Sequence, residues 1–417
     1  MAVTKSNLTH KLALATSALL AHEAHSEQDE GSELYNKWEV DVGYLHYNEP
    51  NYISVDTYMA MINGNLSDKD SIKLGLVFDT LSGATPTGAL PGSDTVTVGG
   101  ASGGNISAAE SAGGTAPFDD TRLAIDTVWG HEWQRLMRTD AGIHISVEGD
   151  YTSVGGSLAL ELDSEDRATT YTIGGGTTSD KISRSSPQTP SPLTDSSLGA
   201  MFGVGHKNSY DLLLGVSRVI NRRTVGMLNF TYSQSLGYHT DPYKVISVAD
   251  ADDTEYGTVY EQRPDSRERF ILYSKIKHEL PKSGHHLGLS YRFHTDSWDL
   301  NSHTLEGTYG FPIFKTHRLE PFARLYNQQA ANFYSRTILA PTNATDVDAR
   351  DLVTYASADI RLADMLSATI GAKFQYKTSK KGSIDFRLAY YYREYKDAVI
   401  SNDDAVFAVI DFGKSFD

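Results

Sequence analysis

The chain has no cysteine and comparatively few basic side chains. Its 417 residues contain 37 Lys or Arg against 53 Asp or Glu, so the formal net charge is −16 at neutral pH. The lack of cysteine excludes disulfides, thiolate metal sites and a cysteine nucleophile. The acidic balance argues against nucleic acid as a partner, because a phosphate backbone is bound through basic patches.

Long hydrophobic runs are also missing, and the one short apolar run lies near the N-terminus. The string "LALATSALLA" (12–21) follows Lys5 and Lys11, and at about ten residues it is too short to form a membrane-spanning helix. A basic start and a short apolar centre are typical of a secretory signal peptide, with a short amphipathic helix as the alternative. We therefore expect a signal peptide over residues 1–26 and a short acidic segment over 27–34.

Alternation of apolar and polar residues recurs along most of the remaining chain. In "SIKLGLVF" (71–78), Ile72 and Leu74 begin an apolar face, whereas Lys73 and Gly75 lie on the other face. The same alternation is found in "GIHISVEGDY", "HLGLSYRFHTD", "LSATIGAKFQYK" and "SIDFRLAYYYREY". A period of two residues predicts β-strands with one apolar and one polar face.

Strand length and aromatic placement decide between two all-β folds. A sandwich of antiparallel sheets also alternates, but its strands are usually about 5–6 residues long. The segments here are about 10–15 residues long, enough to cross a bilayer at a tilt. Aromatic residues end the apolar faces: Trp38, Tyr44, Trp129, Trp133, Tyr238, Trp298, Tyr390 and Tyr392. We therefore predict an all-β fold, a transmembrane antiparallel β-barrel with aromatic girdles at both membrane interfaces.

The connections between the segments differ in length. Short connections such as 66–70 and 164–168 alternate with long ones, as in outer-membrane barrels with short periplasmic turns and long extracellular loops. The long connections are 81–118, 179–207, 239–264 and 335–349. About seventeen segments alternate, but a single-chain bacterial barrel needs an even number. Assigning 353–364 to a loop leaves about 16 strands in a single domain over 35–417, with about 14 or 18 as alternatives.

Several strings, in order along the chain, resemble one family of proteobacterial outer-membrane proteins, domain of unknown function 3570. They are "FDTLSGATPTG" (78–88), "LLGVSRVINRRT" (213–224), "GYHTDPYK" (237–244), "RPDSRERF" (263–270), "YRFHTDSWDLNSHTLEG" (291–307), "LEPFARLYNQQAANFYS" (319–335) and "YASADIRL" (355–362). The resemblance implies a β-barrel in the outer membrane of a Gram-negative bacterium. It supplies no activity and no cofactor that could be transferred to this chain.

Charged residues at the polar positions of the strands are expected to face the lumen. Glu148, Asp150, Glu161 and Asp163 belong to two consecutive strands and should form one acidic patch. The expected lumen-facing charges are Glu148, Asp150, Glu161, Asp163, Arg267, Arg269, Lys275, Lys277, Arg292, Lys373, Lys377, Asp385, Arg387 and Arg393. Opposed rows of charge across a pore create a transverse field that filters polar solutes. The alternative is that these side chains pair with neighbours and fill a polar interior, since charges in a wet pore cost little.

Four charged residues lie near the two ends of the expected loop 239–264. Asp241, Lys244, Arg263 and Asp265 are expected to tie this loop back to its strand by ion pairs. A docking surface for a protein partner is the alternative reading of the same residues.

Four carboxylates lie in the middle of the same loop. Asp250, Asp252, Asp253 and Glu255 form a weak candidate Ca2+ site, because hard cations need several converging oxygen ligands. Their spacing is not that of an EF-hand loop, so a solvated acidic loop is the default expectation.

The sequence carries no recognisable nucleophile or nucleotide-binding motif. His131, His206, His239 and His294 have no partner that the sequence can assign, so we expect no enzyme. The leading hypothesis is a porin-like conduit for small polar or charged solutes. The alternative is a non-catalytic sleeve, or an export or anchoring partner for another envelope protein, for which the resemblance suggests a redox carrier.

The expected partners follow from the predicted barrel. They are the lipid bilayer and lipopolysaccharide, and a periplasmic or extracellular protein if the barrel acts as a sleeve. The string "AVFAVIDFGKSFD" resembles the strand signal that the barrel-insertion machinery reads during assembly, so this machinery is a further expected partner. Nucleic acid is not expected.

Overall fold

The computed structural model describes most of the chain beyond its N-terminal segment. The described residues are 38–50, 52–90, 98–99, 105–106, 115–184, 188–198, 201–281, 284–343, 347–379 and 382–416. The expected signal peptide (1–26) and acidic segment (27–34) lie outside the described residues. No helix within the described ranges is long and apolar enough to cross a membrane.

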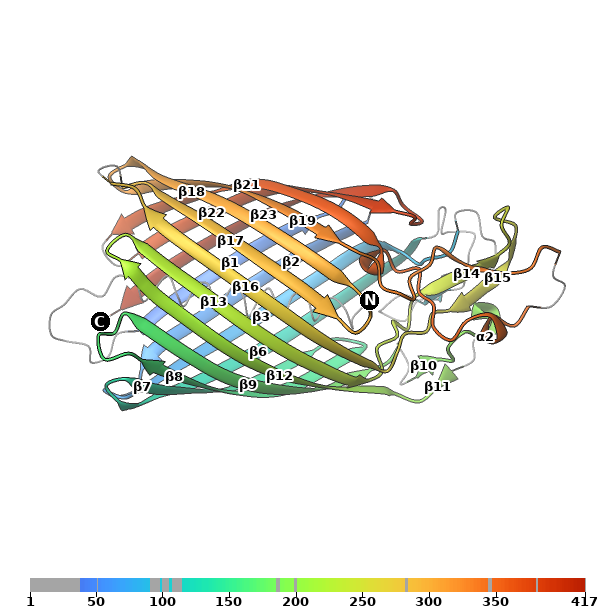
Figure 1. The fold of residues 1–417 in the computed structure, drawn as a ribbon, viewed down its shortest axis with the longest axis horizontal. Helices are drawn as coiled ribbons and strands as arrows, with labels where there is room; N and C mark the ends of the chain where they lie inside the picture. The colour runs from blue at the N-terminus through green and yellow to red at the C-terminus, as the bar shows by residue number, and fades with distance from the viewer. Residues whose placement is uncertain are drawn as a thin grey trace.

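Sixteen antiparallel strands form one closed barrel (Figure 1). In the order of their pairing they are β1 (Trp38–Asn48), β2 (Ile53–Asn65), β3 (Asp70–Pro86), β6 (Thr115–Gln134), β7 (Met137–Val147), β8 (Tyr151–Asp163), β9 (Thr169–Ile182), β12 (Gly205–Asn221), β13 (Thr224–Gly237), β16 (Ser266–Glu279), β17 (His286–Asp296), β18 (Asn301–Phe314), β19 (His317–Gln328), β21 (Asp364–Ser379), β22 (Gly382–Lys396) and β23 (Asn402–Phe416). The barrel closes where β1 pairs with β23, with Trp38 opposite Phe416. The predicted fold class and strand number are therefore confirmed.

The alternation of each strand sorts its side chains between the outside and the lumen. On β13, Leu228 and Phe230 keep 46% and 36% of their surface exposed, although they are large and apolar. Asn229 and Thr231 alternate with them and point to the other face, because successive strand residues point to opposite faces. Exposed Leu, Ile, Phe and Tyr side chains recur in this way around the barrel. Such an apolar outer band is what a lipid-facing barrel surface requires.

Aromatic residues gather on the outer face, but two of the predicted girdle residues do not. Trp129 and Trp133 are exposed and pack on either side of His131. Trp298, in contrast, is 3% exposed, and Tyr238 packs against a buried cluster. Both residues lie just beyond the end of a strand, where the alternation ends and the chain turns inward. The girdle prediction is therefore wrong for Trp298 and Tyr238.

The two ends of the barrel carry different connections. At one end, here called the turn end, β2 and β3 are joined by 66–69 and β8 and β9 by 164–168. At the other, the loop end, β9 and β12 are joined by 183–204 and β19 and β21 by 329–363. As predicted, the segment 353–364 is not a barrel strand. Its surroundings hold the short helices α2 (Ala349–Leu352) and η3 (Ile360–Leu362).

Strands β3 and β6 are longer than the sequence suggested. They continue to Pro86 and from Thr115, so their connection is shorter than the expected loop 81–118. Backbone pairing between Leu81 and Asp120 and beyond extends the two strands past the apolar band. The extra pairing holds because hydrogen bonding between neighbouring strands does not depend on the lipid.

Several loop-end connections pack together into a folded unit, which we call the cap (Figure 1). The elements of these connections are β4 (Val98–Gly99), β5 (Asn105–Ile106), β10 (Thr189–Pro190), η2 (Ser196–Leu198), β11 (Met201–Phe202), β14 (Val245–Ala249), β15 (Glu255–Tyr260), β20 (Thr337–Leu339), α2 and η3. A three-stranded sheet with the order β15–β14–β20 forms its centre. Its apolar core includes Leu193, Ile246 and Ile338, which come from three different connections.

Hydrogen bonds hold the cap to the barrel rim. The ammonium group of Lys244 donates to the carbonyl of Pro86 at the end of β3. The backbone N–H of Leu90 donates to the Ser247 hydroxyl at 2.9 Å. The cap therefore rests on the barrel at the loop end.

Candidate functional site

Strand β16 brings its four basic residues to the lumen side. Phe270, Leu272 and Ile276 are exposed on the outer face of this strand. Arg267, Arg269, Lys275 and Lys277 occupy the alternate positions and therefore point inward. The same reasoning places Arg292 on the inner face of β17, Lys373 and Lys377 on that of β21, and Asp385, Arg387 and Arg393 on that of β22.

Several of these inward side chains remain exposed. Arg292, Lys377 and Arg387 are exposed, although they lie on the inner face of a closed barrel. Arg324, which also points inward from β19, keeps 51% of its side chain accessible. A side chain on the inner face can be exposed only where other side chains do not fill the lumen around it. These residues therefore border unfilled space in the lumen.

Other lumen charges are neutralised by direct partners. Lys373 lies 2.9 Å from Asp385 on the neighbouring strand. Near the rim, Arg393 is 2.5 Å from both Glu49 and Asp403. These pairs lie on the stretch of the barrel wall from β21 to β1. They agree with the alternative hypothesis, in which the lumen charges pair with neighbours and fill a polar interior.

The four acidic residues near β7 and β8 do not form one patch. Glu148 and Asp150 lie in the connection that precedes β8, at the loop end. Glu161 and Asp163 lie at the far end of the same strand, beside the turn 164–168. Glu161 is paired with Arg138 at 2.7 Å. The prediction of a single acidic patch was wrong because β8 runs the length of the barrel wall between the two pairs.

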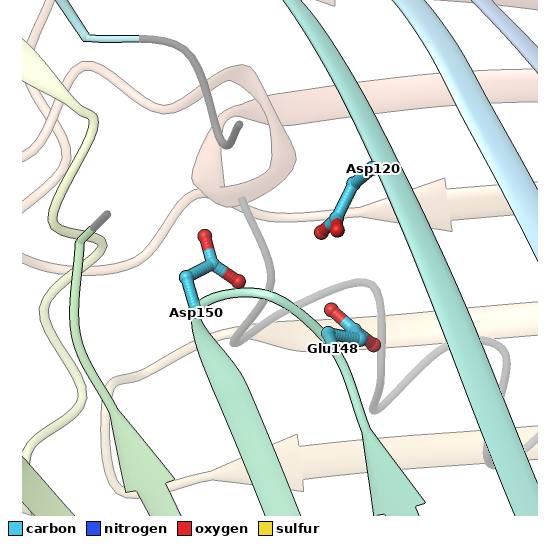
Figure 2. Close-up of side chains that lie close together, drawn as sticks. All are labelled: Asp120, Glu148 and Asp150. Atoms are coloured by element: carbon cyan, nitrogen blue, oxygen red, sulfur yellow. The ribbon is translucent and has the colours of Figure 1, made fainter. Parts of the chain in front are cut away.

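Glu148 and Asp150 meet a third carboxylate, which the sequence analysis did not single out. Asp120 on β6 completes a cluster in which the ligand oxygens of the three side chains all lie within 4.8 Å of one another. Figure 2 shows the three carboxylates converging from β6 and from the β7–β8 connection. The register explains the meeting, because Leu123 pairs with Val147, so β6 continues past the point where β7 ends.

Burial and mutual repulsion raise the pKa values of this cluster. Desolvation, followed by the carboxylates of Asp150 and Asp120, raises the pKa of Glu148 to about 8. Desolvation also raises the pKa of Asp150 to about 6, and the carboxylate of Asp120 adds to the shift. The nearby guanidinium of Arg122 is paired with Asp79, where its Nε donates to the carboxylate at 2.6 Å. The positive charge of Arg122 also acts on Glu148, where it lowers the pKa and offsets part of the rise.

The expected loop ion pairs lie deep inside the cap, and their partners come both from the same connection and from another one. Arg263 lies 2.6 Å from Glu261 and 2.8 Å from Asp359. Arg361 lies 3.0 Å from Asp241. Burial alone would raise the pKa of Asp359, but the positive charges of Arg361 and Lys244 outweigh it and hold the pKa well below its usual range.

This network ties connection 238–265 to connection 329–363 and not to its own strand. Asp265 contributes its backbone carbonyl, which accepts from Gly237 N–H at 2.7 Å. The network was missed in part because Glu261, Asp359 and Arg361 were not grouped with the other charges. The strings that carry the family resemblance contained a signal, since "GYHTDPYK", "RPDSRERF" and "YASADIRL" each supply a member.

The acidic loop around Asp250 does not gather its carboxylates as a cation site would. Asp250 accepts from the backbone N–H groups of Asp252 and Thr254, each at 3.0 Å, and so stabilises its own turn. Asp253 is paired with Arg336 at 2.5 Å. None of the four, including Glu255, belongs to a group of converging ligand atoms in the described chain. The weak Ca2+ candidate is therefore wrong, because these side chains serve the turn and an ion pair.

One histidine has a serine partner that the sequence could not assign. His239 Nε2 lies 2.7 Å from the Ser235 hydroxyl, and its Nδ1 lies 2.7 Å from the carbonyl of Gly237. The two side chains are only 7% and 2% exposed, and the ring of Trp298 packs edge-on against the imidazole. A buried pair oriented by a backbone carbonyl is suited to holding the chain where β13 enters the cap.

The chain is similar to several solved structures at low sequence identity. The chain is similar to one described as "Bacterial polysaccharide outer membrane secretin" at 9% identity and a TM-score of 0.48, covering 93% of this chain and 100% of that chain. It is also similar to the CymD monoaromatic hydrocarbon channel at 10% identity and a TM-score of 0.39, covering 92% and 89% of the two chains. For OccK3 (OpdO) of Pseudomonas aeruginosa the identity is 7%, the TM-score 0.41 and the coverage 91% and 95%. At these levels the likeness carries no argument about function.

The comparison at the level of families is more direct. No curated protein matches the chain. The sequence profile of a family described as "Protein of unknown function (DUF3570)" matches residues 9–406. Because this match spans nearly all of the sequence, the chain belongs to the DUF3570 family.

Proposed function

We propose that the protein is a porin-like conduit in the outer membrane of a Gram-negative bacterium, with its loop end outside the cell. Small polar or charged solutes pass through its lumen. The observation that carries this proposal is the exposure of Arg292, Arg324 and Arg387 on the inner face of a closed barrel. A lumen packed solid with side chains would bury these guanidinium groups, and burying charged groups is costly.

The charges of the lumen indicate what passes most easily. Among the described residues, neither Arg292 nor Arg387 has a carboxylate within 4 Å, whereas Arg324 is paired with Glu306. Unpaired guanidinium groups in a wet lumen attract anions and offer them directed hydrogen-bond donors. The conduit is therefore expected to favour solutes that carry an anionic group.

The cap gives the conduit a folded entrance. Solutes that arrive from the loop end meet the cap before the lumen, since its sheet sits beyond the barrel strands (Figure 1). A folded entrance restricts size and orientation more strictly than mobile loops do. The proposal therefore concerns a selective conduit for small solutes.

Planar-bilayer recordings test the proposal. The purified chain should give open conductance steps of constant size. In the double variant Arg292→Glu/Arg387→Glu, the ratio of Cl− to K+ permeability, measured from the reversal potential in a KCl gradient, should fall several-fold. Arg222→Glu is the matched control, because Arg222 is exposed in the turn between β12 and β13 and lies outside the lumen. Unchanged reversal potentials in the double variant would contradict the proposed preference for anions.

A barrel without conductance would reject the conduit itself. If such a silent barrel co-purified from native membranes with one envelope protein, the sleeve or anchoring role would replace the conduit as the proposed function.

A further inference from the structure

Arg269 is a buried cation of the lumen wall that has no ion-pair partner among the described residues. It lies on β16 near the loop end and points inward, because its neighbour Phe270 is exposed on the outer face. Only 8% of the residue is exposed. Its Nη2 donates to the hydroxyl of Ser233 at 3.0 Å, and its Nε is buried without a hydrogen-bond partner in the described chain. A guanidinium carries five N–H donors, so most of them are unused.

The carboxylate directly across from Arg269, that of Asp296, is engaged by other groups. Its Oδ2 accepts from Nε of Arg267 at 2.7 Å and also from Nη2 of the same side chain. Its Oδ1 accepts from the backbone N–H groups of Trp298 and Leu300, at 2.9 Å and 3.1 Å. All four of these donors belong to residues other than Arg269. Asp296 therefore neutralises Arg267 first.

The charges that act most strongly on Arg269 leave a surplus of positive charge. They are Arg267, Asp211, Asp296 and Arg292, of which Arg267 and Asp296 pair with each other. Asp211 is exposed on β12, two strands away, and forms no ion pair with Arg269 in the described chain. Arg292 adds a second guanidinium without a carboxylate within 4 Å among the described residues. Two cations thus face one carboxylate that acts from a distance.

The hydroxyl of Ser233 adds a donor beside this surplus. Its oxygen accepts from Arg269, so its own O–H remains available, and no described residue accepts from it. Ser233 is also buried, at 4% exposure. Buried polar groups are almost always satisfied, and a buried charge is costly unless it is paired. A guanidinium and a hydroxyl with unused donors therefore mark a place for an acceptor of negative charge.

We propose that Arg269 and Ser233 bind an oxyanion group of a solute, a carboxylate or a phosphate, at the loop end of the lumen. Guanidinium groups suit both, because their planar N–H donors match the oxygens of either group. Arg292 lies four residues before Asp296 on β17 and therefore deeper in the lumen, where it attracts the anion onward.

The role of this site rests on the proposed conduit. Arg269 acts electrostatically on His239, which lies where β13 enters the cap. An anionic solute that has passed the cap would therefore meet this site before it meets Arg292. The conduit would then hold its solutes at a fixed position and not merely attract them.

Calorimetric titration of the folded chain in detergent micelles at low ionic strength tests the site, with sodium phosphate and sodium succinate as separate probes. We expect saturable binding of at least one probe, and the probe that binds identifies the group. Arg269→Gln should weaken this binding at least tenfold. Arg222→Gln is the matched control, because it removes the same charge from an exposed turn, and it should bind as the parent chain does.

Asp211→Asn provides the opposite change. It removes the carboxylate that competes with the anion for Arg269, so it should tighten binding several-fold, which a purely structural role of Arg269 would not produce. Folding of each variant is verified by the heat-dependent migration of the barrel on denaturing gels. If Arg269→Gln does not fold, Arg292→Gln takes its place and should weaken binding several-fold.

Three results would overturn the proposal. They are no saturable binding of either probe by the parent chain, parent-like affinity in the folded arginine variant, and unchanged or weaker affinity in Asp211→Asn. The titrations need no current, so the site and the conduit can fail separately. A silent barrel that binds phosphate would reject the conduit and keep the site, whereas a conducting barrel that binds neither probe would reject the site alone.

Discussion

At the residue scale, His239 is held as a neutral imidazole inside the cap. The geometry suits one tautomer, in which Nδ1–H donates to the carbonyl of Gly237 and Nε2 accepts from the Ser235 hydroxyl, each at 2.7 Å. Desolvation, together with the positive charges of Lys207, Arg267 and Arg269, lowers the pKa of His239 to about 3. Protonation would break the bond from Ser235 and place a charge in a buried site.

The stability of the cap should therefore decrease as the pH is lowered. Because the pKa of His239 is lower in the folded state than its unfolded value of about 6.5, the unfolded state binds the proton first. The contribution is fully present above pH 6.5 and is lost, at about 1.4 kcal/mol per pH unit, as the pH falls from 6.5 toward 3. Urea midpoints of the cap at several pH values measure this slope. His239→Gln should flatten it, and His131→Gln, at the turn end, should not.

Single residues at strand ends were the hardest to predict. Tyr238 continues the apolar alternation of β13 in the sequence, yet Gly237 has a φ of 109° and redirects the chain. A side chain there would be strained, and an added Cβ would lie 2.2 Å from the carbonyl of His206. The alternation of apolar and polar residues does not predict such a turn. The glycine itself was the available signal, because positive φ is its special capacity.

At the scale of elements, the barrel strands could be predicted and the cap could not. Each barrel strand carries its own period-two signal over many residues, so its two faces are readable from a local string. The cap strands β14 and β20 have only five and three residues. Ile246 and Ile338 meet in the cap core, although they are far apart in sequence. A core assembled from distant short segments leaves no periodic trace.

Buried ion pairs hold the elements of the cap together, and Arg263 is central to them. Its guanidinium lies between Glu261 and Asp359, both almost fully buried. Arg263→Met should loosen the cap by about 3–5 kcal/mol, because it leaves the buried carboxylate of Glu261 without its ion-pair partner and removes one of the two guanidinium groups that contact Asp359. Limited proteolysis should then cleave 238–265 and 329–363 while the barrel stays intact.

Arg350→Met is the matched control for this change. Arg350 pairs with Asp348 in the same connection as Asp359, but its side chain is 62% exposed. Exposed pairs contribute little, so the cleavage pattern should stay that of the parent chain. Equal resistance of the Arg263 and Arg350 variants would show that the buried network does not hold the cap.

At the scale of the whole molecule, the barrel and the cap are stabilised in different ways. The barrel is a closed ring in which every strand is paired on both sides, from β1 to β23 and back. Closure removes the edges at which strands separate first. The cap has small apolar clusters and buried charges instead. Such regions open at lower free energy than the elements on which they rest.

Denaturation should therefore proceed in two steps, and the tryptophans can report both. The chain has 4 tryptophans, of which Trp298 is buried in the cap beside Phe333, whereas Trp129 and Trp133 are exposed on the outer face of the barrel. Urea should first change the emission of Trp298, and only a higher concentration should affect the barrel. Trp298→Phe should abolish the first fluorescence transition, and Trp129→Phe should preserve it. A single transition shared by both variants would mean that cap and barrel unfold as one unit.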